Sequence, residues 1–115
     1  MNSYELIINK SKFISYRYDL STLSDVETIL SSLKKQYKKA THICYAYIYN
    51  RDSVHEKCSD DGEPSGTAGY PILNVLKKKN LTNILVVVVR YFGGIKLGAG
   101  GLTRAYTKAC AEVLK

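Results

Sequence analysis

The hydrophobic residues of this 115-residue chain recur with two periods, which together predict five strands and three helices. Alternation of apolar and polar positions is typical of strands, and apolar residues three or four positions apart are typical of helices. The predicted strands span 4–8, 12–18, 42–50, 54–59 and 84–89, and the predicted helices span 24–39, 71–80 and 98–114. The order is ββαββαβα, which indicates an α/β chain of the two-layer α+β kind forming one domain over 1–115.

Two of the strands also predict how the sheet is covered. In 42–50, a small apolar set alternates with a row of tyrosines, Tyr45, Tyr47 and Tyr49. We expect the small set to lie under a helix and the tyrosines to lie on the opposite face, where they form a candidate platform for stacking unpaired bases. A protein-docking face or an ordinary half-exposed strand explains the same row. Residues 84–89 are apolar throughout, as in a central strand covered on both faces or nearly so.

The positive charge is confined to the second part of the chain. Residues 1–64 contain nine Lys and Arg against nine Asp and Glu, whereas 65–115 contain eight against one, so the whole net charge of +7 lies in the last 51 residues. A basic half attracts phosphate-rich or acidic partners over long range.

The cellular location is predicted from segments that the sequence lacks. No apolar run approaches the roughly 18 to 20 residues of a membrane span, and no signal-peptide pattern opens the chain. Three widely spaced cysteines fit a reducing compartment. We therefore expect a cytoplasmic protein with no membrane partner; the oligomeric state stays open.

A glycine-rich segment joins the last strand to the last helix. Five glycines fall within nine residues, and such a junction lets backbone amides and a helix N-terminus approach an anion. The candidate anion or nucleic-acid site comprises Arg90, Gly93, Gly94, Lys96, Gly98, Gly100, Gly101 and Arg104. The spacing matches neither a P-loop nor a dinucleotide fingerprint. Alternatively, the glycines only form a tight turn and let the helix pack closely.

An acidic motif precedes the second helix and comprises Asp60, Asp61, Glu63, Ser65 and Thr67. Its carboxylates suit Mg²⁺ or acid/base chemistry, although the spacing differs from that of an EF-hand loop. The alternative is a loop that caps the next helix or pairs with the basic half. Zinc needs four convergent ligands, and among the His and Cys residues only His55 and Cys58 have a ligand-like spacing. We expect no metal, no cofactor and no catalytic residue.

Several motifs resemble the IMPACT/YigZ family. The resemblance rests on 60–69, 71–73 and 89–106, with 10–14 and 42–47 in the same order upstream. It implies a sheet like that of the second domain of a small-subunit ribosomal protein, with the helices on one face. It also implies a role in translation regulation and the stress response, which eukaryotic members exert by competing for the activator of a starvation-sensing kinase.

Three hypotheses about function follow. The first is a non-catalytic binding module that meets RNA, the ribosome or a protein partner in translational control through the basic Gly-rich surface. The second is an enzyme that acts on a phosphorylated small molecule or nucleotide, with the acidic loop holding Mg²⁺. In the third, the acidic motif pairs with Arg90 or Arg104 and locks the fold.

Overall fold

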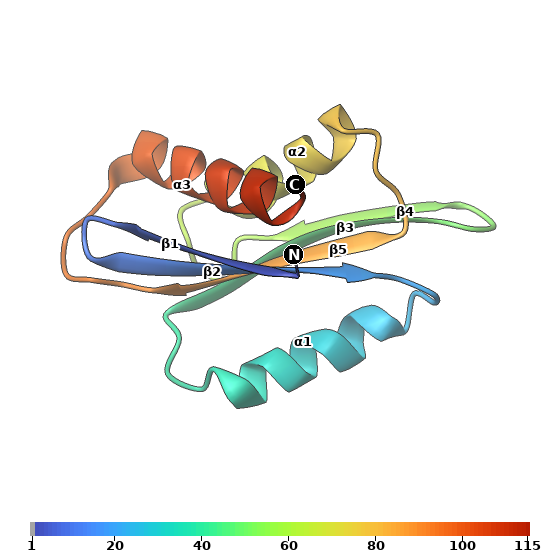
Figure 1. The fold of residues 1–115 in the computed structure, drawn as a ribbon, viewed down its shortest axis with the longest axis horizontal. Coiled ribbons are helices and arrows are strands. Elements are labelled where there is room, and N and C mark those ends of the chain that lie inside the picture. The colour runs from blue at the N-terminus through green and yellow to red at the C-terminus, as the bar shows by residue number, and fades with distance from the viewer. Residues whose placement is uncertain (1) are drawn as a thin grey trace.

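The computed structural model describes residues 2–115 and contains one five-stranded antiparallel sheet with three helices (Figure 1). The elements are β1 (Ser3–Ile8), β2 (Ser11–Asp19), α1 (Asp25–Gln36), β3 (His42–Asn50), β4 (Val54–Ser59), α2 (Gly69–Lys78), β5 (Ile84–Tyr91) and α3 (Gly98–Val113). The strand order is β1-β2-β5-β3-β4. The α+β class and the predicted order ββαββαβα are confirmed.

The helices lie on both faces of the sheet, so the expectation of two layers with all helices on one face is wrong. Figure 1 shows α2 and α3 on one side and α1 on the other. The physical reason lies in the central strand β5, whose residues from Ile84 to Arg90 are all buried. A strand that is apolar on both faces needs cover on both.

Two hydrophobic clusters therefore flank the sheet. Val86 and Val88 of β5 face α2 and α3, where the largest fully buried side chain is Tyr106. Leu85, Val87 and Val89 face α1. The alternation predicted for β3 is present as well: its small apolar residues are in the first cluster, and its tyrosines pack against the second.

The half-buried tyrosines fill the layer under α1. Tyr45 and Tyr47 have parallel rings 6.4 Å apart, and both line a pocket whose other wall includes Leu23 and Leu30. The tyrosine row is therefore partly covered by α1. Among residues 2–115, no helix has the length and apolar character that a membrane span requires.

Candidate anion-binding site

The acidic motif and the Gly-rich segment meet where β5 ends. Between them lies a pocket of about 370 Å³. Glu63 of the acidic motif and the adjacent Pro64 line it on one side, and Phe92, Lys96 and the first residues of α3 line it on the other. Both motifs singled out in the sequence thus border one site, although they are separated by the whole of α2 and β5.

Arg90 lies inside this junction, not on its surface. Its Nη1 donates to both carboxylate oxygens of Glu63 at 2.9 and 2.8 Å, and its Nη2 donates to Ser11 Oγ at 3.2 Å. Arg90 is only 5% exposed and Glu63 only 7%. The rings of Phe13 and Phe92 each lie 5.5 Å from the guanidinium. Arg90 therefore forms a buried ion pair that joins the acidic motif to β5, as the third hypothesis expects.

Glu63 also has partners from other elements. Tyr106 of α3 donates its hydroxyl to Glu63 Oε2 at 2.5 Å, and His42 Nε2 lies 3.5 Å from Glu63 Oε1. Burial, followed by its contacts with Cys44 and Glu63, raises the pKa of Tyr106, so its phenol stays neutral and donates. The carboxylate of Glu63 is thereby occupied by interior donors.

Asp60 caps the helix that follows it. Its Oδ1 accepts from the amides of Ala68 and Gly69 at 3.1 and 2.8 Å, and its Oδ2 accepts from Gly66 at 2.9 Å. Burial alone would raise the pKa of Asp60, but these three N–H donors together hold it below its ordinary value. The capping role considered from the sequence is therefore present.

Two other members of the acidic motif form hydrogen bonds that hold the loop in place. Asp61 Oδ2 accepts from the backbone N–H of Ile43 at 2.7 Å, and Thr67 Oγ1 donates to the Pro64 carbonyl at 2.6 Å. Ser65 is exposed. The three carboxylates point at different partners, and within residues 2–115 no group of three or more His, Cys, Asp or Glu side chains is placed to hold a metal ion.

The glycines of the candidate site differ in what they do. A Cβ on Gly93 would lie 2.0 Å from the Lys10 carbonyl oxygen, so Gly93 allows the β1–β2 turn to pack against the loop. Gly94 and Gly98 have φ of +88° and +73°, which disfavour any other residue. A Cβ on Gly100 would meet only the exposed Arg104 guanidinium, at 3.2 Å, and one on Gly101 would meet Leu97 at 3.1 Å.

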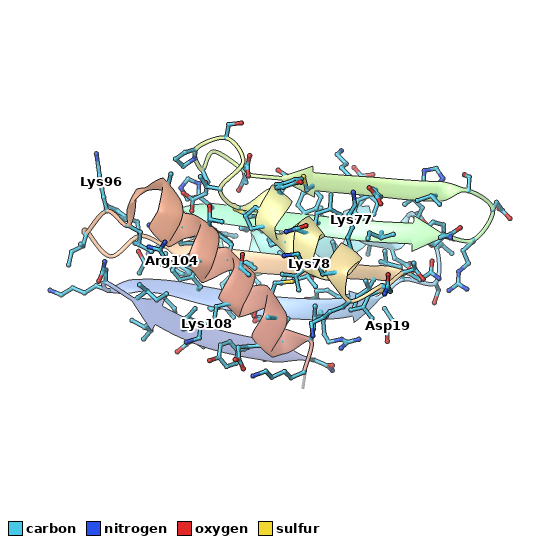
Figure 2. The ribbon with its side chains drawn as sticks, turned by 90° about the horizontal axis from the view of Figure 1, so that it is seen from above. Asp19, Lys77, Lys78, Lys96, Arg104 and Lys108 are labelled. Carbon is cyan, nitrogen blue, oxygen red and sulfur yellow. The ribbon has the colours of Figure 1, made fainter. Side chains whose placement is uncertain are left out.

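Three exposed cations form a ridge along α3 and the loop before it, which we define as Lys96, Arg104 and Lys108. Figure 2 shows this ridge beside Lys77 and Lys78 of α2. Lys77 pairs with Glu56 at 3.1 Å, whereas within residues 2–115 no salt bridge involves Lys78 or a ridge residue. The ridge lies on the side of the sheet opposite α1, so the structure does not bring it together with the tyrosine row.

Sequence reasoning missed Lys108 and Tyr106 as parts of this region. Lys108 follows Arg104 by four residues, which is the helical spacing that places two side chains on one face. Tyr106 falls on the apolar stripe of the last helix, and that spacing by itself indicates only a core position. Its phenolic group was the available signal, because a buried hydroxyl needs a partner.

The structure thus defines an antiparallel α+β domain in which a Gly-rich loop and an acidic loop border one pocket. The chain belongs to the IMPACT family: the sequence profile of the Impact N-terminal domain matches residues 9–114. The IMPACT family member YvyE of Bacillus subtilis (strain 168) is 50% identical over 111 residues, covering 96% of this chain and 51% of YvyE. The chain thus spans about half the length of this relative.

Two solved structures share the fold. The crystal structure of a hypothetical protein has a TM-score of 0.91 at 36% identity, covering 98% of this chain and 56% of that one. The two-domain translational regulator Yih1 has a TM-score of 0.63 at 22% identity, covering 97% of this chain and 45% of Yih1. At that identity the likeness to Yih1 concerns the fold alone.

Proposed function

We propose that this chain is a non-catalytic binding module of translational control that binds RNA through the ridge. The observation that carries the proposal is the ridge of exposed cations, which have no salt-bridge partner among residues 2–115 (Figure 2). Between Gly98 and Ala111, α3 contains no Asp or Glu, so nothing on the helix offsets their field there. Phosphate backbones bind such a surface by releasing counterions.

The translational part of the proposal comes from relatives. Yih1, which shares the fold, is described as a translational regulator, and family membership brings that role to this chain as an expectation. The chain spans only about half the length of its bacterial relative YvyE. The proposal therefore concerns RNA binding by the ridge and not the activity of a whole family member.

The chemistry of the acidic motif favours binding over catalysis. Asp60 and Asp61 accept hydrogen bonds from backbone amides, and Glu63 is held in the buried network. A Mg²⁺-dependent enzyme would need carboxylate oxygens free to converge on the ion. We therefore base the function on the ridge.

Salt dependence of RNA binding tests the proposal. Fluorescence anisotropy with a short single-stranded RNA should give an affinity that falls linearly on a log–log plot of salt. Lys108→Ala and Arg104→Ala should each weaken binding and reduce the slope by roughly 0.7 per lost phosphate contact.

The matched control is Lys35→Ala, which removes the same charge from exposed α1 on the opposite face. This variant should bind like the parent chain. Affinity that is independent of salt, or equal losses in all three variants, would contradict the proposal. Capture from cytosol that survives ribonuclease would instead favour a protein partner.

A further inference from the structure

The N-terminus of α3 opens into the pocket without a cap. Gly98 and Ala99 line the pocket, Leu97 at the N-cap position makes no side-chain cap bond, and the first turn holds no acid. Within residues 2–115, neither of these two amides donates a hydrogen bond. In α2, by contrast, Asp60 accepts from the amides of Gly69, its first residue, and of Ala68 at the N-cap position. First-turn N–H groups together with the helix dipole favour an anion.

A second observation inside the same pocket is independent of the helix. Arg90 lines the pocket with a side chain only 6% exposed, and its Nε has no hydrogen-bond partner among residues 2–115. A buried N–H without an acceptor is costly; because the Nε has almost no accessible surface, an oxygen ligand in the pocket reaches it only when the Arg90 side chain shifts.

The charges around the pocket also suit an anion. Glu63 is the carboxylate that lines it, and this group is neutralised by Arg90 and occupied by Tyr106. Lys96 adds an exposed cation at the rim, without a salt bridge among the described residues (Figure 2). The local balance is therefore positive, with the helix N-terminus adding to it.

The size and walls of the pocket indicate more than a bare ion. Its volume of about 370 Å³ falls within the range of small-molecule sites. Phe92 on its wall is 46% exposed, and its ring is held by Arg90 on one side. An exposed aromatic ring next to an anion site offers a stacking surface for a base.

We propose that this pocket binds the phosphate of a nucleotide as a monoester, with the base on Phe92. The monoester belongs either to the 5′-phosphorylated end of an RNA strand or to a free nucleotide. The first of these two sources rests on the proposed function. A terminal monoester carries close to two negative charges near neutral pH and has one neighbouring sugar. The ridge then follows the strand that leaves the pocket.

One RNA sequence prepared with a 5′-phosphate and with a 5′-hydroxyl tests the inference. The phosphorylated form should bind about tenfold more tightly, which corresponds to about 1.4 kcal/mol. Ala99→Glu should abolish that preference, because its carboxylate competes for the first-turn amides. Ala99 is exposed, and an acid at a helix N-terminus is favourable, so the variant should fold. Thr107→Glu adds the same charge at an exposed position two turns along α3 and should keep the preference.

NMR shifts of the Gly98 and Ala99 amides separate the two sources. A nucleoside monophosphate should shift them in the parent chain at lower concentration than inorganic phosphate does, and Phe92→Ala should remove that difference. Equal binding of both RNAs with no amide shifts would overturn the pocket, although salt-dependent binding would leave the ridge intact. Amide shifts with the monophosphate but no RNA binding would support the pocket with a free nucleotide and contradict the proposed function. Equal potency of inorganic phosphate would overturn the role of Phe92.

Discussion

Asp60 and Glu63 lie three residues apart, yet their carboxylates do different work. Asp60 sits near the surface and satisfies three backbone N–H groups at the start of α2. Glu63 is buried and balances Arg90. A buried ion pair adds little net stability compared with an apolar pair, but loss of one partner leaves an uncompensated charge. Asp60 stabilises a helix end, whereas Glu63 compensates the buried charge of Arg90 beside the pocket.

The cap makes stability depend on pH. Asp60→Ala should lower the free energy of unfolding by about 1–2 kcal/mol at pH 7. The folded-state pKa of Asp60 lies below its unfolded value, so the stabilisation is present above the unfolded pKa of about 3.9 and is lost as pH falls through the lower, folded value. Urea unfolding at pH 7 and near pH 2 measures the change.

Asp52→Ala is the control, because Asp52 is exposed and forms no hydrogen bond or salt bridge among the described residues. It should have little effect at either pH. A loss from Asp60→Ala as large in acid as at neutral pH would show that the ionised carboxylate is not the stabilising group.

Between elements, the loop at Gly93 packs closely against the β1–β2 turn. Gly93→Ala should destabilise the protein by about 1–3 kcal/mol, because the new Cβ would meet the Lys10 backbone, which cannot swing away. Gly100→Ala should be neutral or stabilising by up to about 1 kcal/mol, because Ala favours a helix and only the flexible Arg104 tip lies near. Thermal unfolding of both variants compares the two positions. Equal changes in stability for the two variants would contradict the distinction between Gly93, which is needed for close packing, and Gly100, which only occupies a helix position.

The element boundaries show what local patterns can predict. The last helix was expected over 98–114 and is observed over Gly98–Val113, because its apolar stripe runs to its end. The first helix was expected to reach 39 but ends at Gln36, where the Tyr37 backbone leaves helical angles and its hydroxyl meets that of Tyr16 on β2. The second helix begins at Gly69, ahead of Pro71, because Asp60 caps it from the preceding loop. Both differences depend on contacts between elements.

The site was harder to predict than the fold, because its geometry depends on contacts between residues that are far apart in the sequence. Arg90 was expected among the anion ligands from its place beside the glycines. Its orientation on β5 and its partner Glu63, 27 residues earlier, place it in the interior. Lys96 and Arg104 needed no such partner, and both are exposed as a basic surface requires. Local sequence identifies a surface charge more easily than a buried pair.

Across the whole molecule, the two faces of the sheet differ in how firmly they are covered. α3 buries six residues and α2 also six, whereas α1 buries only Val26, Leu30 and Leu33. Much of the remaining contact of α1 is with half-buried tyrosines. Segments with little buried apolar surface open at lower free energy. The face that bears the pocket and the ridge is therefore the rigid one.

Hydrogen exchange should resolve this difference. Amides of α1 should exchange through an opening of lower free energy than those of β5 and α3, because α1 can detach while the other cluster stays packed. Leu30→Ala removes a buried contact worth about 2–5 kcal/mol and should speed exchange in α1 first. RNA binding by the ridge should change little, since α1 lies on the opposite face. If α1 were protected as strongly as β5, both faces would belong to one cooperative unit, and Leu30→Ala would loosen the pocket as much as the helix it alters.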